Sequence, residues 1–399
     1  MSGRAVLDGN GAIAEAARLS RVEVVSAYPI TPQTAIAEGL AEMVGKGELA
    51  ARYLRVESEH SALAAAIGAC LVGARAFSAT SSVGLALMHE VLGTASGCRQ
   101  PLVMGVVNRA LLGPWNVWGD QSDAMGTRDQ GWLSLFASTV QEALDLTIMA
   151  YRVAEDRRVL LPVMVNIDGF FLSHVTETLH LPAQQAVDAF LPPRTASPVR
   201  LDVDQPMVVN PLTPPDLYTE VRHQHSLAMD AARQVIDEVM AEFRQQFDRP
   251  YGQLECFGHP DADLVLVALG SVCGTIQHML KGDGRSERVQ LIKLTTFRPF
   301  PAESLRAACQ NAGAVGVIER SPALGYVGPL TSEVKAALYG LDKPPRVMGF
   351  VSGLGGRDIA PATITKMIKS LSTLQESSFP STSSQWIDLR SGGINDFQF

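Results

Sequence analysis

The chain has 399 residues, of which 46% are apolar, and its formal net charge is −8 at pH 7. This length suits two domains with sizeable cores. The Lys and Arg residues are scattered, and no apolar run reaches the roughly 18–20 residues that span a bilayer, so the sequence argues against a nucleic-acid partner and a membrane span.

The N-terminal residues M-S-G-R-A-V-L-D-G-N lack the basic start and apolar block of a secretory signal, so we expect a soluble, cytoplasmic protein. The five cysteines are widely spaced and include no C-x-x-C pair. This spacing argues against a disulfide framework and against a zinc or iron–sulfur centre held by this chain alone. We expect all of them to be small buried apolar residues: Cys70, Cys98, Cys256, Cys273 and Cys309.

The first part of the chain alternates apolar runs with helical stretches from Ala12 to Ile167. Because the apolar runs are continuous, they predict a parallel sheet covered on both faces, whose ligands bind outside the carboxyl ends of the strands. The predicted strands are Val22–Ser26, Tyr53–Val56, Ala74–Ala79, Pro101–Val107 and Val159–Ile167, and the predicted helices are near 33–45, 60–72, 84–97 and 139–156. The candidate ligand-binding loops are 27–33, 57–60, 79–84, 108–132 and 166–174.

The periodicity is lost from Ser173 to about Asp263, where Pro and charged residues are frequent. One amphipathic helix stands out there, because apolar residues recur at three- and four-residue spacing from Ala232 to Phe247. We therefore interpret 176–260 as a connecting segment with one docked helix.

A second, smaller α/β domain is predicted over 261–371. Its predicted strands are Leu264–Leu269, Val289–Leu294, Gly313–Glu319 and Pro345–Val351, with helices near 274–280, 302–312, 329–340 and 361–371. The predicted fold class is α/β with two doubly wound, mostly parallel-sheet domains, the first over 1–175.

The Ser-rich C-terminal tail, 372–399, carries several large apolar side chains. They favour docking onto a partner, with a free tail as the alternative: Trp386, Ile387, Leu389 and Phe397.

Two carboxylates stand at the start of a helix of small residues. Glu57 and Glu59 follow the predicted strand Tyr53–Val56, and the helix after them is mainly Ala, Gly, Ser and Cys, which lets a backbone or a cofactor come close. A carboxylate at a helix start is favoured by the helix dipole and partly desolvated by its surroundings. This combination prepares a glutamate to hold or move a proton; an ordinary acid at a helix start is the alternative.

Two turns at the sheet edge carry hydroxyl groups. In A-Y-P-I-T-P (27–32), two prolines fix the backbone that presents the Thr31 hydroxyl, although such pairs usually form only a turn. In S-A-T-S-S-V-G (78–84), hydroxyls before a helix could receive an anion or a substrate, or could be an ordinary cap. Neither G-x-G-x-x-G nor a Walker-type loop is present, so a dinucleotide site is not supported.

The long stretch 108–132 carries a candidate for substrate recognition. Strand Pro101–Val107 brings Arg109 to its carboxyl end, where a guanidinium can donate two parallel hydrogen bonds to a carboxylate. Loops this long inside a domain are usually functional or disordered, and three tryptophans favour order. The alternative for Arg109 is a structural salt bridge to an aspartate of the same stretch: Asp120, Asp123 or Asp129.

Eight short motifs follow one another in the order Y-P-I-T-P, V-E-S-E-H-S-A, T-S-S-V-G, N-R-A-L-L-G-P, G-D-Q-S-D, Y-R-V-A-E-D-R-R-V-L-L-P-V-M-V-N-I-D-G-F, F-R-P-F-P and G-L-G-G-R-D. Together they resemble the α subunit of pyruvate:ferredoxin oxidoreductase, one of the 2-oxoacid:acceptor oxidoreductases that depend on thiamine diphosphate and iron–sulfur clusters. The resemblance runs from about residue 12 to 370 and is weaker over 175–260.

The resemblance implies a first domain that covers the aminopyrimidine end of thiamine diphosphate and a second domain like the C-terminal domain of transketolase. A β subunit would hold the diphosphate, its Mg²⁺ and a [4Fe–4S] cluster, and this chain would hold no metal. A γ subunit and a ferredoxin-like δ subunit would complete the complex, and a dimer of such heteromers is allowed.

The implied reaction is oxidative decarboxylation of a pyruvate-type 2-oxoacid to acyl-CoA and CO₂, with CoA as co-substrate. Electrons would pass to iron–sulfur clusters in partner subunits and on to ferredoxin or NAD.

The resemblance also assigns roles to single residues. Glu59 would meet N1′ of the aminopyrimidine, while Thr31 and Arg109 would meet the 2-oxoacid. The other expected cofactor-binding residues are Tyr28, Pro29, Thr80, Ser81 and Ser82.

Two positions depart from the family's pyruvate-specific pattern. Members that act on pyruvate often carry a small polar residue at the position of Leu112 and an aliphatic residue at that of Trp115. If both side chains line the pocket, the substrate is a bulkier 2-oxoacid such as phenylglyoxylate.

Two other kinds of function stay open at this point. A transketolase-like or dehydrogenase component would use thiamine diphosphate without an iron–sulfur partner. A non-catalytic assembly subunit would support a catalytic β chain, and Glu59→Gln or Arg109→Ala would then leave turnover intact.

Overall fold

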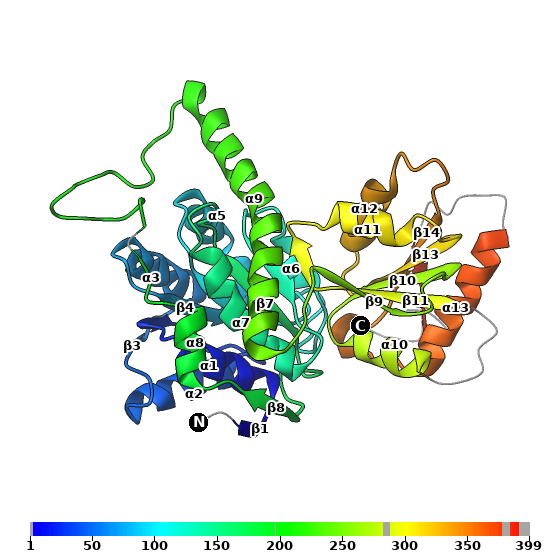
Figure 1. Cartoon of the computed structure of the whole chain (residues 1–399), viewed down its shortest axis with the longest axis horizontal. Coiled ribbons are helices and arrows are strands. Elements are labelled where there is room, and N and C mark those ends of the chain that lie inside the picture. The colour runs from blue at the N-terminus through cyan, green and yellow to red at the C-terminus, as the bar shows by residue number, and fades with distance from the viewer. Residues whose placement is uncertain (1–2, 196, 282–287, 377–383, 391–399) are drawn as a thin grey trace. The chain divides into compact units, whose positions relative to one another are not determined.

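The computed structural model describes residues 3–195, 197–281, 288–376 and 384–390, which form two compact units (Figure 1). The first unit contains the chain up to Gln253 together with Thr295–Pro301, and the second contains Leu254–Leu294 together with the chain from Ala302 onward. Most of the segment 176–260, expected to be a connection, therefore packs as part of the first unit.

Over the described residues, the first unit is built on a seven-stranded sheet. Its neighbouring strands run parallel, except that β12 pairs with β6 antiparallel. The strand order is β12 (Thr296–Arg298), β6 (Leu133–Phe136), β7 (Val163–Asp168), β5 (Val103–Asn108), β4 (Ala76–Thr80), β2 (Val24–Ser26) and β3 (Arg52–Leu54). All the strands expected in this part of the chain are confirmed with shifted bounds, and β6 and β12 are additional.

Helices cover both faces of this sheet. On β5, Val103 and Val107 belong to a core that includes α1 and α7, whereas Met104 and Val106 belong to a second core that includes α3 and α5. Burial on both faces explains the continuous apolar runs and confirms the doubly wound fold. The helices around the sheet are α1 (Gly9–Leu19), α2 (Thr34–Gly45), α3 (Glu59–Leu71), α4 (Ser82–Leu87), α5 (His89–Gly97), α6 (Ser122–Gly126) and α7 (Val140–Ala154). The expected helix 84–97 is thus divided into α4 and α5.

The segment expected to lack periodicity contains further elements. β8 (Glu177–Leu181) pairs antiparallel with β1 (Gly3–Leu7), and α8 (Gln184–Phe190) precedes the long helix α9 (Pro215–Phe247). The expected apolar face of α9 packs on the first core, but the helix begins far earlier than expected. Its first ten residues are all exposed, and Figure 1 shows these turns extending away from the rest of the unit.

The second unit has a six-stranded sheet over its described residues. The four expected strands are confirmed in the parallel order β14 (Arg346–Val351), β13 (Ala314–Glu319), β10 (Leu264–Leu269) and β11 (Val289–Leu294). β9 (Leu254–Gly258) adds antiparallel to β11 at one edge. The helices are α10 (Val272–Leu280), α11 (Ala302–Cys309), α12 (Pro329–Leu338) and α13 (Pro361–Glu376).

Part of the C-terminal tail packs on the second unit itself. β15 (Gln385–Trp386) adds to β14, and Ile387 lies in this unit's core, so the alternative of a free tail is wrong for these residues, while docking onto a partner stays a prediction. Trp386 and Leu389 are exposed, and Phe397 lies outside the described residues. The open edge of β14 accepts the strand, because an unpaired edge offers free backbone groups.

Cys256 corrects the expectation that every cysteine is buried. It is exposed because it lies on the edge strand β9, whereas the remaining four are buried. Among the described residues, no cluster of His, Cys, Asp and Glu could hold a metal ion. The helices of the described part include none that is long and apolar enough to cross a bilayer.

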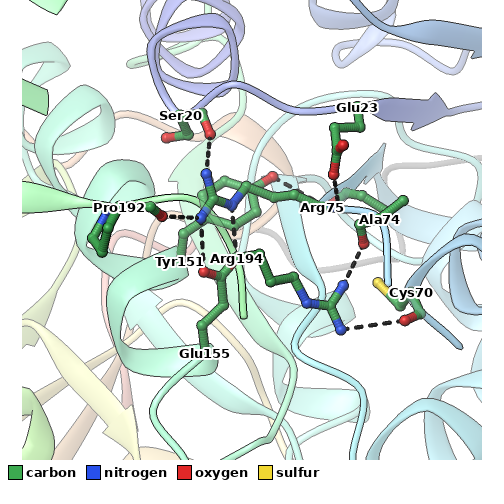
Figure 2. Close-up of polar contacts among 10 residues, drawn as sticks. Ser20, Glu23, Cys70, Ala74, Arg75, Tyr151, Glu155, Pro192 and Arg194 are labelled. Carbon is green, nitrogen blue, oxygen red and sulfur yellow. Dashed lines mark hydrogen bonds and ion pairs between the residues drawn. The ribbon is translucent and has the colours of Figure 1, made fainter. Parts of the chain in front are cut away.

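A buried ion pair holds the amino end of β4 (Figure 2). Arg75 is 4% exposed, and its guanidinium donates to both carboxylate oxygens of Glu155, at 2.7 and 2.8 Å. It also donates to the carbonyls of Ser20 and Pro192, while Arg194 donates to that of Cys70 at the end of α3. This network fixes the edge of the sheet opposite the candidate loops.

Candidate active site

The loops at the carboxyl edge of the first sheet converge through glycines. A Cβ atom at Gly169 would lie 2.5 Å from the Asn108 carbonyl oxygen and 3.0 Å from the Pro32 ring. A Cβ atom at Gly119 would lie 2.4 Å from the Gly169 carbonyl oxygen. Three loops from distant parts of the sequence are therefore in direct contact, as the strand order predicts.

Glu59 is the first residue of α3. The Ser58 hydroxyl caps this helix by accepting a hydrogen bond from the Ser61 N–H, which leaves the Glu59 side chain free of a capping role. Glu59 is 8% exposed, and in the described part of the chain its carboxylate accepts no hydrogen bond. Glu57, in contrast, is exposed and accepts a hydrogen bond from the Ser61 hydroxyl.

The turn after β4 lies directly against Glu59. A Cβ atom at Gly84 would come within 2.7 Å of Glu59 Oε1 and 2.6 Å of Thr80 Oγ1. Thr80 Oγ1 is itself buried without a partner among the described residues. A carboxylate, an unsatisfied hydroxyl and a backbone without a side chain therefore meet at one place, and they fit the polar edge of the expected aminopyrimidine ring.

The hydroxyls of Ser81 and Ser82 have internal partners. Ser81 Oγ donates to the Val107 carbonyl at 2.6 Å, and Ser82 Oγ donates to the Ala110 carbonyl at 2.5 Å. These bonds join the β4–α4 turn to β5 and to the loop behind it. Thr80 thus keeps its hydroxyl unpaired, while Ser81 and Ser82 hold the turn in place.

Arg109 follows β5 directly and is 6% exposed. Its Nη1 donates to the Thr31 carbonyl at 2.8 Å, and its Nε lies 3.4 Å from the Asn116 carbonyl. Burial lowers the pKa of Arg109. In the described part of the chain the guanidinium forms no ion pair, which differs from the alternative of a structural salt bridge to a nearby aspartate.

The other expected site residues differ in exposure. Tyr28 is half-buried against the core around α3, and Pro29 and Thr31 are exposed. Leu112 and Trp115 are 49% and 83% exposed, so neither is enclosed by this chain.

Asp123 lies among these loops, and the sequence indicated it only as a salt-bridge partner of Arg109. Its carboxylate is 2% exposed and accepts hydrogen bonds from the backbone N–H groups of Ser82, Arg109 and Ala124. Burial raises the pKa of Asp123 to about 7, while these donors favour its ionised form. The sequence offered only the G-D-Q-S-D motif as a signal.

Two family models match the chain and together cover most of it. The model described as "Pyruvate flavodoxin/ferredoxin oxidoreductase, thiamine diP-bdg" matches residues 15–241, and "Pyruvate:ferredoxin oxidoreductase core domain II" matches residues 262–364.

Curated relatives match over their full length. Pyruvate synthase subunit PorA of Methanothermobacter thermautotrophicus is 44% identical over 96% of this chain and 98% of the relative. Ketoisovalerate oxidoreductase subunit VorA of Pyrococcus horikoshii is 41% identical over 96% of this chain and 98% of the relative.

A solved structure shares the fold. The 2-oxoglutarate:ferredoxin oxidoreductase from Magnetococcus marinus has a TM-score of 0.72 and 21% identity, covering 92% of this chain and 65% of that chain. A split-gene transketolase gives a TM-score of 0.53 at 14% identity, covering 92% of this chain and 99% of that one.

Proposed function

The chain belongs to the pyruvate flavodoxin/ferredoxin oxidoreductase family, and from this premise we propose that it contributes Glu59, Thr31 and Arg109 to the active site. As a family member it is a subunit of a thiamine-diphosphate-dependent 2-oxoacid oxidoreductase. The proposed reaction is the oxidative decarboxylation of a 2-oxoacid to acyl-CoA and CO₂.

The observation that carries this proposal is the state of the Glu59 carboxylate. It is buried, stands at a helix start and accepts no hydrogen bond within the described residues. A carboxylate with little access to water and no donor from the described part of its own chain is free to bind a group from outside the chain. The N1′ atom of an aminopyrimidine supplies such a group.

Thiamine diphosphate, when bound, supplies a carbon nucleophile and an electron sink for decarboxylation. Glu59 would hold the proton at N1′, which makes the amino group on the opposite side of the ring a better base. Tyr28, Pro29 and Thr80 would border the ring, and the absence of a side chain at Gly84 leaves room for the Glu59 carboxylate beside the turn.

Arg109 would orient the substrate carboxylate. Nη1 and Nε donate to carbonyls, while Nη2 donates to no group in the described part of the chain. A guanidinium nitrogen with free N–H groups, fixed by its neighbours, is suited to a carboxylate. The adjacent Thr31 would complete the substrate's surroundings from the exposed turn 27–32.

The remaining components would come from partner subunits. We propose a β subunit that holds the diphosphate, Mg²⁺ and a [4Fe–4S] cluster, with γ and ferredoxin-like δ subunits, CoA as co-substrate and ferredoxin or NAD as the final acceptor. The names of the relatives, which call them subunits, support a heteromeric enzyme.

The substrate is proposed to be pyruvate or a similar aliphatic 2-oxoacid, since relatives named for pyruvate and for ketoisovalerate have 44% and 41% identity. A second candidate is an aromatic 2-oxoacid such as phenylglyoxylate. The observation that favours it is the apolar pair Leu112 and Trp115, exposed on the loop that follows Arg109.

The test is to purify the chain with whatever accompanies it, measure iron and thiamine diphosphate, and compare pyruvate, ketoisovalerate and phenylglyoxylate as substrates with CoA. CoA-dependent turnover and an iron–sulfur partner are expected, and a clear preference for pyruvate would exclude the aromatic candidate. A complex whose turnover survives both Glu59→Gln and Arg109→Ala would instead indicate a non-catalytic assembly subunit.

A further inference from the structure

The Asp123 carboxylate collects hydrogen bonds from separate parts of the site. Oδ2 accepts from the backbone N–H of Ser82 at 2.8 Å and of Arg109 at 3.0 Å. Oδ1 accepts from the Ala124 N–H at 2.8 Å and from Asn108 Nδ2 at 3.1 Å. One buried side chain thus links the turn beside Glu59, the end of β5 and the start of α6.

We propose that Asp123 is a positioning residue that fixes Arg109 and the turn at Ser82 in one arrangement. The inference rests on the proposed function, since it assigns Asp123 a role through the substrate-binding Arg109 and the cofactor-facing turn. Asp123 itself touches neither ligand in this scheme.

The conformation of Ser82 supports this role. Ser82 has a φ of 48°, in the left-handed region that a serine rarely adopts without support. Its N–H is held by Asp123 and its hydroxyl by the Ala110 carbonyl. The turn that brings Gly84 against Glu59 is therefore maintained by contacts with the Arg109 loop.

The same contacts close the base of the loop after Arg109. The Ala110 N–H donates to the Trp118 carbonyl at 3.0 Å, and the Ala110 carbonyl accepts from Ser82. The intervening residues, including Leu112 and Trp115, therefore form a loop whose two ends are held together. The position of these ends depends on Asp123. A shift of this carboxylate would move the loop and the guanidinium together.

Asp123→Asn separates positioning from general stability. An asparagine amide presents N–H groups to two of the four donors whichever way it is turned, so two buried donors lose their acceptor. Asp145→Asn is the matched control, because Asp145 is also fully buried but pairs with Arg249 and Tyr251 away from these loops.

In the assembled complex, both variants are expected to lower the thermal midpoint. Only Asp123→Asn is expected to raise the KM for the 2-oxoacid and the dissociation constant of thiamine diphosphate, each at least about tenfold. If Asp123→Asn loses thermal stability as the control does but keeps both constants, Asp123 is merely structural and the proposal is overturned.

If Asp123→Asn does not assemble, Asn108→Ala removes one donor and tests the same network. A raised KM supports the proposal, and an unchanged KM overturns it. Failure of the proposed function gives a different result, because Arg109→Ala would then leave the KM of a stable complex unchanged.

Discussion

Gly84 sets how closely the turn after β4 approaches Glu59 and Thr80. Gly84→Ala would place a methyl group 2.7 Å from Glu59 Oε1, so the carboxylate or the turn must shift. Overpacking of this kind costs about 1–3 kcal/mol. We therefore expect thiamine diphosphate to bind roughly tenfold more weakly or worse, as measured by titration of the apo complex.

The control for this substitution is Gly68→Ala on α3. No atom lies within 4 Å of a Cβ at Gly68, so alanine there should leave cofactor affinity unchanged and stabilise the helix by about 0.5–1 kcal/mol. Equal cofactor affinities for the two variants would show that the position of the Glu59 carboxylate beside Gly84 does not govern cofactor binding.

At the scale of single residues, sequence order predicted which side chains reach the sheet edge but not how they are bonded. Arg109 and Glu59 could be placed because each follows a recognisable strand. The roles of Gly84 and Asp123 come from tertiary contacts, which no local sequence pattern predicts. The hydrogen bonds of the Ser81 and Ser82 hydroxyls could likewise not be predicted, since their acceptors lie more than 25 residues away in the sequence.

Among the elements, β4 depends on the buried ion pair at its amino end. Arg75→Met would leave Glu155 with an unpaired, mostly buried carboxylate, and breaking a buried pair on one side costs about 3–5 kcal/mol. Arg158→Met is the matched control, because the Arg158 side chain is 49% exposed in its ion pairs with Asp156 and Glu238. This substitution should lower the free energy of unfolding by less than about 1 kcal/mol. Thermal unfolding of both variants checks this, and similar losses would contradict it.

The start of α12 depends on a carboxylate from another element. Glu319, at the end of β13, is 1% exposed and accepts the backbone N–H of Thr331 in the first turn of α12. Burial raises its pKa to about 7, above its value in the unfolded chain. The contribution of Glu319 to the free energy of unfolding is therefore fully present below the pKa that this carboxyl has in the unfolded chain. It is lost as the pH rises towards 7.

Glu319→Gln removes this titration while keeping the shape of the side chain. Between about pH 4.5 and 7, the wild-type chain should lose on the order of 3 kcal/mol relative to the variant. Unfolding by denaturant at both pH values measures the difference. Parallel pH dependences of the two chains would mean that Glu319 does not titrate in this range.

The elements that sequence patterns missed are those whose stability comes from distant neighbours. β6 spans only four residues, Leu133–Phe136, and is stabilised by pairing with β7 and β12. β15 is shorter still and exists as an addition to β14. The early turns of α9 bury no apolar face, so the periodicity that located its second half could not mark its start.

At the scale of the whole chain, alternating apolar strands and helices were sufficient to predict two doubly wound α/β units. Their boundaries were harder to predict, because the first unit is discontinuous in sequence: Thr295–Pro301 belongs to it and supplies β12. A segment that returns after about forty residues leaves no local signal. The eight ordered motifs indicated the family, which the family models and relatives confirm, whereas the physical patterns alone indicated only the fold class and the candidate loops.

The proposed role of Glu59 in holding a proton at N1′ gives the most direct test of the function proposed for the complete enzyme. The measurement is the exchange rate of the C2 hydrogen of thiamine diphosphate bound to the purified complex, followed by NMR after rapid mixing into D₂O. Glu59→Gln should slow this exchange by about 100-fold or more, the usual size of a general acid–base contribution, while the cofactor stays bound. An exchange rate equal to that of the wild type, at full cofactor occupancy, would contradict the assignment of Glu59.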